Sequence, residues 1–441
     1  MEPTRAQVVG ALACQRNSYL RTLDAEVISC EKRPPPAPKT SGRDKSAGDA
    51  VSGSSPETWL IEFADSVLFP EGGGQPSDHG TITPLSDPGA PPIPIDLVER
   101  VGLRCVYHSP RPLVPGETAR QEVDFRRRWH HMQQHTGQHL LSAVMDARDG
   151  LKTLGWGMGK GGAMNYVDLP RKPSEAELQA VQARCNDIIR SSLPITVETP
   201  DDAKTHKMPG DYDQANGVVR VIRIGEIDRN TCCGTHLSQT SHLSLVLVHH
   251  GEPVRGNNFR LYFSAGDRAI DLAASSIGAV GAISRLLSSR NTPDEAVRAV
   301  RALQASTAEL KRREKKLLSD LAESAAEAAS ARLRAGKSAW VHRADGNADF
   351  VKRVAAGVRD AVAACGGGGG VVVVATGEEG RGGQLVVLGD KGGVDALVPK
   401  IKDVVEGVKG GGAGDRWQGK VGSWEKDGVE ALRKLVEGLG A

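Results

Sequence analysis

The feature that most constrains the fold is a set of four potential metal ligands drawn from two distant parts of the chain. His135 and His139 stand four residues apart in the run from His130 to Leu141. On a helix this spacing places both imidazoles on one face, with Cβ atoms about 5–6 Å apart, near enough to share a cation. Histidine pairs of this kind also occur in cores and on surfaces without any metal, so the pair needs a second element to become informative.

The second element is a short segment much further along, Thr231-Cys232-Cys233-Gly234-Thr235-His236. It offers a thiolate and a third imidazole four residues apart, after a predicted strand. Alone, Cys232 would be interpreted as a buried, inert thiol. Together, one sulfur and three nitrogens form a donor set that favours zinc over magnesium or calcium. We therefore predict one zinc ion held by His135, His139, Cys232 and His236, which requires the fold to bring the helix and the turn together.

Composition limits the classes of protein to which the chain can belong. The 441 residues carry a net charge of only +2, so any nucleic acid must be held by local basic patches. Seven scattered cysteines argue against a disulfide framework. The N-terminus lacks a signal-peptide pattern, and no run of about 18 apolar residues occurs. We expect a cytoplasmic protein without a membrane span.

The first half of the chain suggests two domains, 1–123 and 124–270. Short strands separated by glycine and proline turns predict a small β-barrel or sandwich in the first, within 8–30, at 59–63 and at 103–107. Residues 31–57, rich in Pro, Ser, Gly and Asp, predict a mobile insertion. In the second, a helix near 130–146 with strands at 218–224 and 243–249 predicts an α+β arrangement of helix on antiparallel sheet.

The second half suggests long helices over 271–337 and an α/β module over 338–441. Thr292-Pro293-Asp294-Glu295 combines a capping residue, a first-turn proline and a glutamate at the third helical position, which predicts a helix start. Leucines then recur at sevens, which fits a helical hairpin or coiled coil, although an ordinary amphipathic helix covering a core fits equally well. The module should contain strands at 371–374 and 385–388 and helices near 393–407 and 428–438. The predicted class is α+β multidomain.

At this point the motifs resemble a known family. His135 to Leu141, taken with Cys232 to His236, closely resembles the editing domain shared by alanyl-tRNA synthetases and the free-standing AlaX proteins. Residues 68–76 look like the glycine-rich motif that precedes that domain, and 411–420 are similar to a segment near the end of the long members. The resemblance covers nearly the whole chain apart from 31–57, and the long, three-part AlaX type matches best. No stretch remains for an aminoacylation domain.

The resemblance implies hydrolysis of serine, with glycine as a second candidate, wrongly esterified to tRNA(Ala). A synthetase pocket built for alanine discriminates against serine, which adds only a hydroxyl, by about a hundredfold. A second site that recognises the serine hydroxyl is therefore needed. Zinc can polarise the carbonyl, lower the pKa of a bound water or hold the amino group. With four protein ligands the tetrahedron is closed, so no general base is assigned. Two alternatives stay open: a catalytically inactive, zinc-stabilised tRNA-binding scaffold, and a synthetase fragment that assists aminoacylation.

Several residues are candidates for contact with the tRNA acceptor end or its phosphates. The glycine-rich loop and the basic run beside the metal helix are two such regions, and a segment near the C-terminus is the third. A tight turn, a solvated charge run and a structural loop are the respective alternatives. The candidates are Gly72, Gly73, Gly74, Gln75, Arg128, Arg416, Trp417 and Lys420.

Two further expectations concern partners. Gly414 to Lys420 matches a nucleotide-binding loop in spacing, but Val421 stands where a magnesium-holding Ser or Thr is required, so ATP is not expected. His130 and His131 are expected near the metal or at the surface rather than as ligands. A homodimer formed through the C-terminal half and a monomer are both compatible with the long helix.

Overall fold

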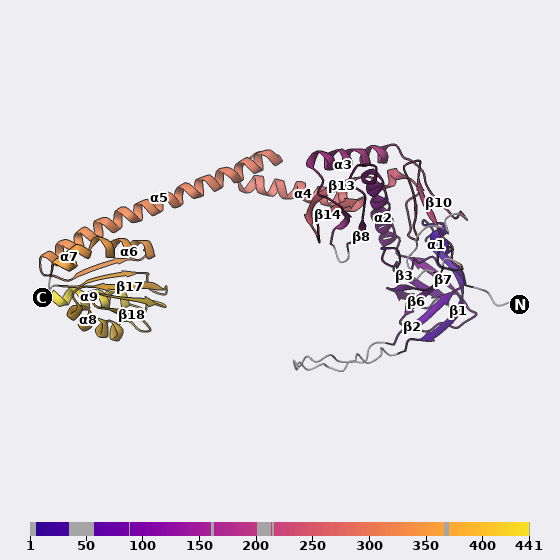
Figure 1. The fold of residues 1–441 in the computed structure, drawn as a ribbon. Helices are drawn as coiled ribbons and strands as arrows, with labels where there is room; N and C mark the ends of the chain where they lie inside the picture. The colour runs from indigo at the N-terminus through magenta and orange to yellow at the C-terminus, as the bar shows by residue number, and fades with distance from the viewer. Residues whose placement is uncertain are drawn as a thin grey trace. The chain divides into compact units, whose positions relative to one another are not determined.

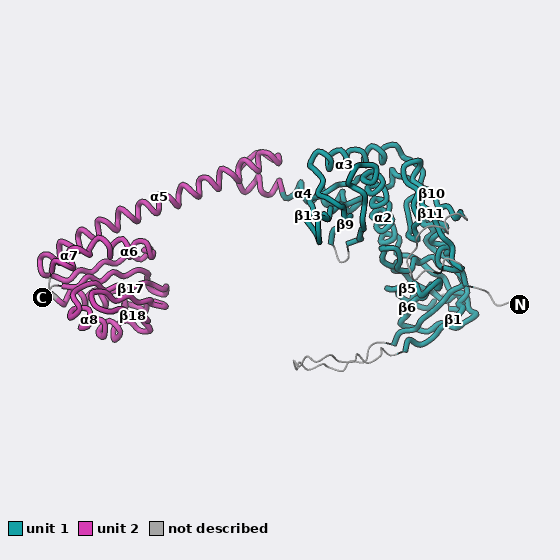
Figure 2. The backbone as a smooth tube through the Cα atoms, in the orientation of Figure 1, with its two compact units in different colours: residues 1–279 teal, residues 280–441 magenta. Residues whose placement is uncertain are grey.

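The structure is a computed structural model, which describes residues 6–34, 57–87, 89–159, 163–200, 213, 216–365 and 370–440. The chain forms two compact units, residues 1–279 and 280–441, coloured teal and magenta in Figure 2. Most of the expected insertion at 31–57 lies outside the described residues. The domain boundaries proposed above stay predictions.

The N-terminal part of the first unit is a seven-stranded antiparallel sheet, in the order β4-β3-β7-β1-β2-β6-β5, that curls into a nearly closed barrel (Figure 1). β1 joins its two halves, because it pairs with β7 along one part of its length and with β2 along the rest. Alternate residues of β7 are buried, as expected for a strand with one face on a core. A short helix α1 (Ala13–Arg16) precedes the strands β1 (Thr22–Lys32), β2 (Trp59–Phe63), β3 (Gly80–Pro84), β4 (Ile93–Ile95), β5 (Val98–Val101), β6 (Arg104–Ser109) and β7 (Thr118–Val123).

The rest of this unit is built around the predicted helix, α2 (Phe125–Asp146), whose N-cap Asp124 accepts a hydrogen bond from the backbone N–H of Arg127. A second helix, α3 (Glu175–Arg190), begins at a capping box formed by Ser174 and Glu177, which the sequence analysis did not identify. Four strands pair in the order β13-β14-β9-β8 and three in the order β10-β11-β12. Their bounds are β8 (Gly155–Gly157), β9 (Asn165–Leu169), β10 (Ile195–Glu198), β11 (Val221–Ile224), β12 (Asp228–Thr231), β13 (Val246–Pro253) and β14 (Phe259–Ala265), with a 3-10 turn η2 (Thr240–Leu243).

α2 lies very close to β14 because Gly137 faces that strand. A Cβ at this position would stand 2.5 Å from the Cβ of Ala265. Apolar residues of the helix, including Leu140, Leu141 and Val144, join one core with residues of the four-stranded sheet. The α+β arrangement predicted for this region is therefore present, with one helix on an antiparallel sheet.

Two helices follow, α4 (Asp267–Leu286) and the 42-residue α5 (Pro293–Arg334). The predicted start of α5 is confirmed: the Thr292 side chain accepts from the N–H of Glu295, and Pro293 is the first helical residue. α4 has a window of mean hydropathy 1.3, of which 17% is buried, so by length and composition it could cross a membrane. Helices that never enter a membrane meet the same criterion, so this one helix is weak support for a span. The expectation of no membrane span is thus not confirmed.

One of the two interpretations of α5, a helix that covers a core, is observed over part of its length. Near its C-terminal end it covers a core, through the buried residues Ala322, Ala326, Ala329 and Leu333. Further toward its start, Leu303, Leu310 and Leu317 are 54%, 60% and 60% exposed. That stretch has no core to cover within the described chain.

The C-terminal module is a five-stranded sheet in the order β15-β16-β17-β19-β18, with α6 and α7 over one face and α8 and α9 over the other (Figure 1). β15 and β16 are parallel, and the other neighbours are antiparallel. Helices and strands are both present here, and the assignment of this part as an α/β module stays a prediction. The bounds are β15 (Ala339–Arg343), α6 (Ala348–Gly357), α7 (Arg359–Ala364), β16 (Val372–Thr376), β17 (Gly383–Leu388), α8 (Lys391–Val404), β18 (Lys409–Ala413), β19 (Arg416–Val421), α9 (Gly428–Glu437) and the short η3 (Gly438–Gly440).

Candidate metal centre

The four predicted ligands come together at one point. Their ligand atoms all lie within 4.8 Å of one another. His135 and His139 project from one face of α2, while Cys232 and His236 follow β12. The sulfur of Cys232 lies 3.3 Å from Nε2 of both His135 and His236. All three histidines are buried and Cys232 is half-buried.

Electrostatics at the centre favour a thiolate. Burial raises the pKa of the Cys232 thiol, but His135 and His236 beside it outweigh burial and hold that pKa well below its ordinary value. Burial opposes the charged form of His139, yet hydrogen bonds with Asp228 and Cys232 raise its pKa to about 10. Burial lowers the pKa of His236 to about 3. The neutral imidazole of His236 beside the thiolate of Cys232 suits a divalent cation, whereas His139 must release a proton to bind one.

The donor set fits zinc on geometry as well as on chemistry. In a tetrahedral site with typical Zn–S and Zn–N bond lengths, sulfur and nitrogen ligands stand roughly 3.5 Å apart. The observed separations of 3.3 Å are close to that value. The fit supports the zinc prediction, and the identity of the cation stays a proposal.

Cys233 does not join the cluster. Burial raises the pKa of its thiol to about 12, which keeps it protonated. Its sulfur instead lies under the glycine-rich loop, where a Cβ on Gly73 would stand 2.5 Å from it. Of the adjacent cysteines, therefore, only Cys232 belongs to the candidate metal site.

The loop that carries Cys232 is held by a buried arginine that the sequence analysis missed. Arg220 donates from Nη1 to the carbonyl oxygens of Cys232 and Gly234, and from Nη2 to that of Gln15. Because these carbonyls flank the ligand, the guanidinium fixes the path of the backbone through it. Nothing local in the sequence signals this role, since Arg220 precedes a strand and looks like a surface residue.

A cavity of about 330 Å³ opens beside the four ligands. The indole of Trp156 lies against the His135 ring, with centroids 4.8 Å apart. Ser142 Oγ accepts hydrogen bonds from Gln138 Nε2 at 2.9 Å and from Thr153 Oγ1 at 3.0 Å. One signal was available in the sequence: Ser142 follows His139 by three residues and so shares its helix face. The lining residues are Gly73, His135, Gln138, His139, Ser142, Asp146, Thr153, Trp156, Asn230, Thr231, Cys232 and Cys233.

The glycine-rich loop lies at the edge of this cavity. Gly73 and Gly74 have φ values of +59° and +83°, which favour glycine. A side chain at Gly74 would meet the Trp156 ring at 2.8 Å, so the loop packs closely over the site. Contact of Gly72, Gly73 and Gly74 with tRNA stays a prediction. Gln75, in contrast, is fully buried and bonded to His135 and Thr235, so its expected contact with tRNA is wrong.

The expected phosphate contact by Arg128 is also wrong. Its guanidinium is fully buried, pairs with the buried carboxylate of Asp78 and donates to the carbonyl oxygens of Ser18 and Val67. This pair ties α2 to the barrel. A buried charge of this kind needs all its donors satisfied inside the protein, which leaves none for RNA.

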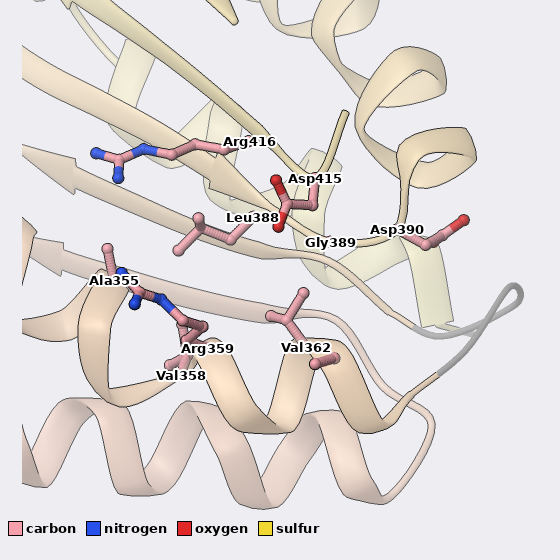
Figure 3. Close-up of a pocket in the computed structure, with 10 residues that line it drawn as sticks. Ala355, Val358, Arg359, Val362, Leu388, Gly389, Asp390, Asp415 and Arg416 are labelled. Carbon is pink, nitrogen blue, oxygen red and sulfur yellow. The ribbon is translucent and has the colours of Figure 1, made fainter. Parts of the chain in front are cut away.

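The three C-terminal candidates do not share one surface. Residues 416–420 form strand β19 rather than a loop, so Arg416 and Lys420 point to one face and Trp417 to the other. Trp417 is buried in the core under α8 and α9, and its predicted contact with tRNA is wrong. Arg416 and Lys420 instead line a groove of about 570 Å³ with Lys352 and Lys409. Figure 3 shows that Arg416 also borders a second cavity, beside Asp415 and above Leu388.

Comparison with known proteins is consistent with these geometric features. The family described as Threonyl and Alanyl tRNA synthetase second additional domain matches residues 219–262, which include Cys232 and His236. The chain is 33% identical to the alanyl-tRNA editing protein Aarsd1 of Mus musculus over 93% of its own length and 94% of the relative's. The chain belongs to the alanyl-tRNA editing proteins.

Other relatives define the extent of the likeness. The Danio rerio alanyl-tRNA editing protein Aarsd1 is 31% identical over 96% of this chain and 97% of its own. An alanine--tRNA ligase of Haloquadratum walsbyi is 28% identical over 69% of this chain but only 34% of the ligase. The likeness to alanyl-tRNA editing proteins is thus end to end, whereas the likeness to the ligase is partial.

Proposed function

We propose that the chain is a trans-editing hydrolase that removes serine from mischarged tRNA(Ala), at a zinc centre formed by His135, His139, Cys232 and His236. Glycine is the second proposed substrate, and no aminoacylation is expected. The observation that carries the proposal is the intact four-ligand cluster at the wall of a cavity large enough for an aminoacyl group. Relatives named as alanyl-tRNA editing proteins support the general activity.

The polar wall of the cavity suits a small side chain with a hydroxyl. Ser142 Oγ acts as acceptor in both of its described hydrogen bonds, so its own proton is free to bond a serine hydroxyl. An alanyl group would leave these polar groups without a partner, which disfavours it. Zinc bound at the four ligands would supply Lewis-acid activation of the ester carbonyl or of water. Trp156, packed on His135, would exclude bulk water from one side of the substrate.

The proposed partner is the acceptor end of tRNA(Ala), in the cytoplasm, with the nucleic acid also held by the C-terminal half. Lys352, Lys409, Arg416 and Lys420 place four cations around one groove, and none of the described residues that line it is acidic. Cations arranged in this way suit phosphates better than an acidic or apolar ligand. No ATP is required for ester hydrolysis.

A deacylation assay on Ser-, Gly- and Ala-charged tRNA(Ala) tests the proposal. We expect the parent to clear Ser-tRNA(Ala) and spare Ala-tRNA(Ala). His135→Ala and Cys232→Ala should lose bound zinc and fall to the uncatalysed rate, because each removes a ligand. Cys30 is a half-buried cysteine of the barrel, so Cys30→Ala is the matched control and should keep both the bound zinc and the hydrolysis rate of the parent.

Two results would contradict the proposal. Equal rates in the parent and both ligand variants would remove the metal centre from the mechanism. A parent that binds zinc and tRNA yet hydrolyses none of the three substrates would support the inactive scaffold instead.

A further inference from the structure

Each histidine of the cluster has a hydrogen-bond partner on the nitrogen that faces away from Cys232. Nδ1 of His135 lies 2.9 Å from Gln75 Oε1, that of His139 lies 3.1 Å from Asp228 Oδ2, and that of His236 lies 3.3 Å from Thr136 Oγ1. In the neutral imidazole, an acceptor at Nδ1 keeps the proton there and leaves the Nε2 lone pair free for a cation. Each of the three imidazoles is therefore held in a single orientation of its own.

Gln75 differs from the other two partners in its place along the chain, because Thr136 lies on α2 and Asp228 lies on β12, which leads directly into Cys232. Its Oε1 accepts from Nδ1 of His135 on α2 and from the backbone N–H of Thr235 at 3.1 Å, between Cys232 and His236. Its Nε2 donates to Thr235 Oγ1 at 2.8 Å. One buried amide thus links the helix that carries two ligands to the loop that carries the other two.

The space around this amide is closely packed. A Cβ on Gly234 would stand 2.3 Å from the His135 ring and 2.8 Å from Gln75 Oε1. No side chain could enter this gap without displacing the ring or the amide. The position of Gln75 relative to both segments is therefore determined by packing as well as by hydrogen bonds.

We infer that Gln75 is a positioning residue of the metal centre, which orients His135 and sets the distance between α2 and the Cys232–His236 loop. The glycine-rich loop then serves the metal as well as the substrate. This inference rests on the zinc centre proposed above. Outer hydrogen-bond partners of metal-bound histidines contribute roughly 10- to 100-fold in metal affinity.

The test compares zinc affinity in Gln75→Met, Gln75→Glu and a matched control, Gln121→Met. Gln121 is equally buried and its amide also makes three hydrogen bonds, with Val67, Tyr107 and Asp65, but in the barrel core. Zinc affinity is measured by competition with a chromophoric chelator, and ligand geometry by the visible absorption of the cobalt-substituted protein. Circular dichroism establishes that each variant is folded.

We expect Gln75→Met to bind zinc about 10- to 100-fold more weakly and to alter the cobalt spectrum. Gln75→Glu keeps the oxygen that accepts from His135 but loses the donor to Thr235, so it should recover part of the affinity. Gln121→Met should bind zinc like the parent.

The outcomes separate this inference from the zinc proposal. A parent that binds no zinc would overturn both. A parent that binds tightly, with Gln75→Met equally tight, would overturn the role of Gln75 and leave the zinc centre standing. An equal loss in Gln75→Met and Gln121→Met would also overturn it, because the effect would then be general loss of packing.

Discussion

His131 lies one helical turn before His135, the first proposed metal ligand, and is a buried, neutral imidazole. It lies on α2 with little exposed surface, and its Nδ1 has no hydrogen-bond partner among the described residues. Burial, with the positive charge of Arg127 nearby, lowers its pKa to about 3. The imidazole is therefore neutral in the folded protein over the whole working range of pH.

This shift predicts a loss of stability in weak acid. Above the ordinary histidine pKa of 6.5, folded and unfolded chains are both neutral at His131 and its contribution is complete. Between that value and about 3 only the unfolded chain takes up the proton, so stability falls as pH falls. From pH 7.5 to pH 5 the loss from this group should be about 2 kcal/mol.

Urea unfolding of the parent and of His131→Asn at pH 7.5 and pH 5 measures the contribution. The change in the free energy of unfolding between pH 7.5 and pH 5 should be smaller in the variant by about 2 kcal/mol, because the asparagine side chain does not titrate. An identical pH dependence in both proteins would show that His131 is not held neutral.

At the scale of single elements, α2 combines two roles along one face. Positions 128, 132, 135 and 139 follow the helical repeat, so Arg128, Met132, His135 and His139 share a buried stripe. Arg128 joins this stripe to the barrel and the histidines join it to the Cys232 loop. The charge run at 126–128 is thus divided, with Arg126 exposed and Arg128 fully buried.

Two glycines in helices should respond oppositely to the same substitution. Gly137→Ala places a methyl group 2.5 Å from the Cβ of Ala265 and should cost about 1–3 kcal/mol of stability through overpacking. Gly278→Ala on α4 meets nothing within 4 Å and should raise helix stability by up to about 1 kcal/mol. Thermal melting of the two variants beside the parent checks that Gly137→Ala lowers the melting temperature and that Gly278→Ala raises it. A Gly137→Ala protein as stable as the parent would show that α2 can move away from β14.

At the scale of the whole molecule, the exposed leucines of α5 have no partner within the described chain. Apolar side chains repeated at sevens on a helix of 42 residues are typical of a helix that pairs with another helix. A second copy of the chain supplies an identical stripe. We therefore propose a homodimer through this part of the C-terminal half.

Sedimentation of charge-substituted variants tests the dimer. Leu310→Lys combined with Leu317→Lys should convert a dimeric parent to a monomer, since paired lysines would then face each other. Ala305→Lys combined with Ser319→Lys adds the same charge on the opposite side of α5 and should stay dimeric. A parent that sediments as a monomer at tens of micromolar would contradict the dimer.

Much of the fold was predictable where the signal is local. The cap at Thr292, the short strands of the barrel and the helix that carries His135 and His139 were each recognisable from neighbouring residues. The four proposed ligands were predictable for the same reason, because each pair lies within one turn of chain and its chemistry is specific. The α3 capping box at Ser174 and Glu177 was equally local and was missed.

Side-chain burial was harder to predict from the sequence, because it depends on which distant segments pack against each other. Successive side chains of a strand point to opposite faces, so the sequence could have shown that Arg416 and Trp417 face opposite sides. This required recognising the segment as strand β19 rather than a loop. That Gln75, Arg128 and Arg220 lie inside follows from the packing of the barrel against α2 and the Cys232 loop. The sequence by itself determined which atoms can bind a cation, since ligand chemistry belongs to individual residues. Only the tertiary structure decided which polar side chains hold those ligands in place, since hydrogen bonds between distant segments exist only after they pack.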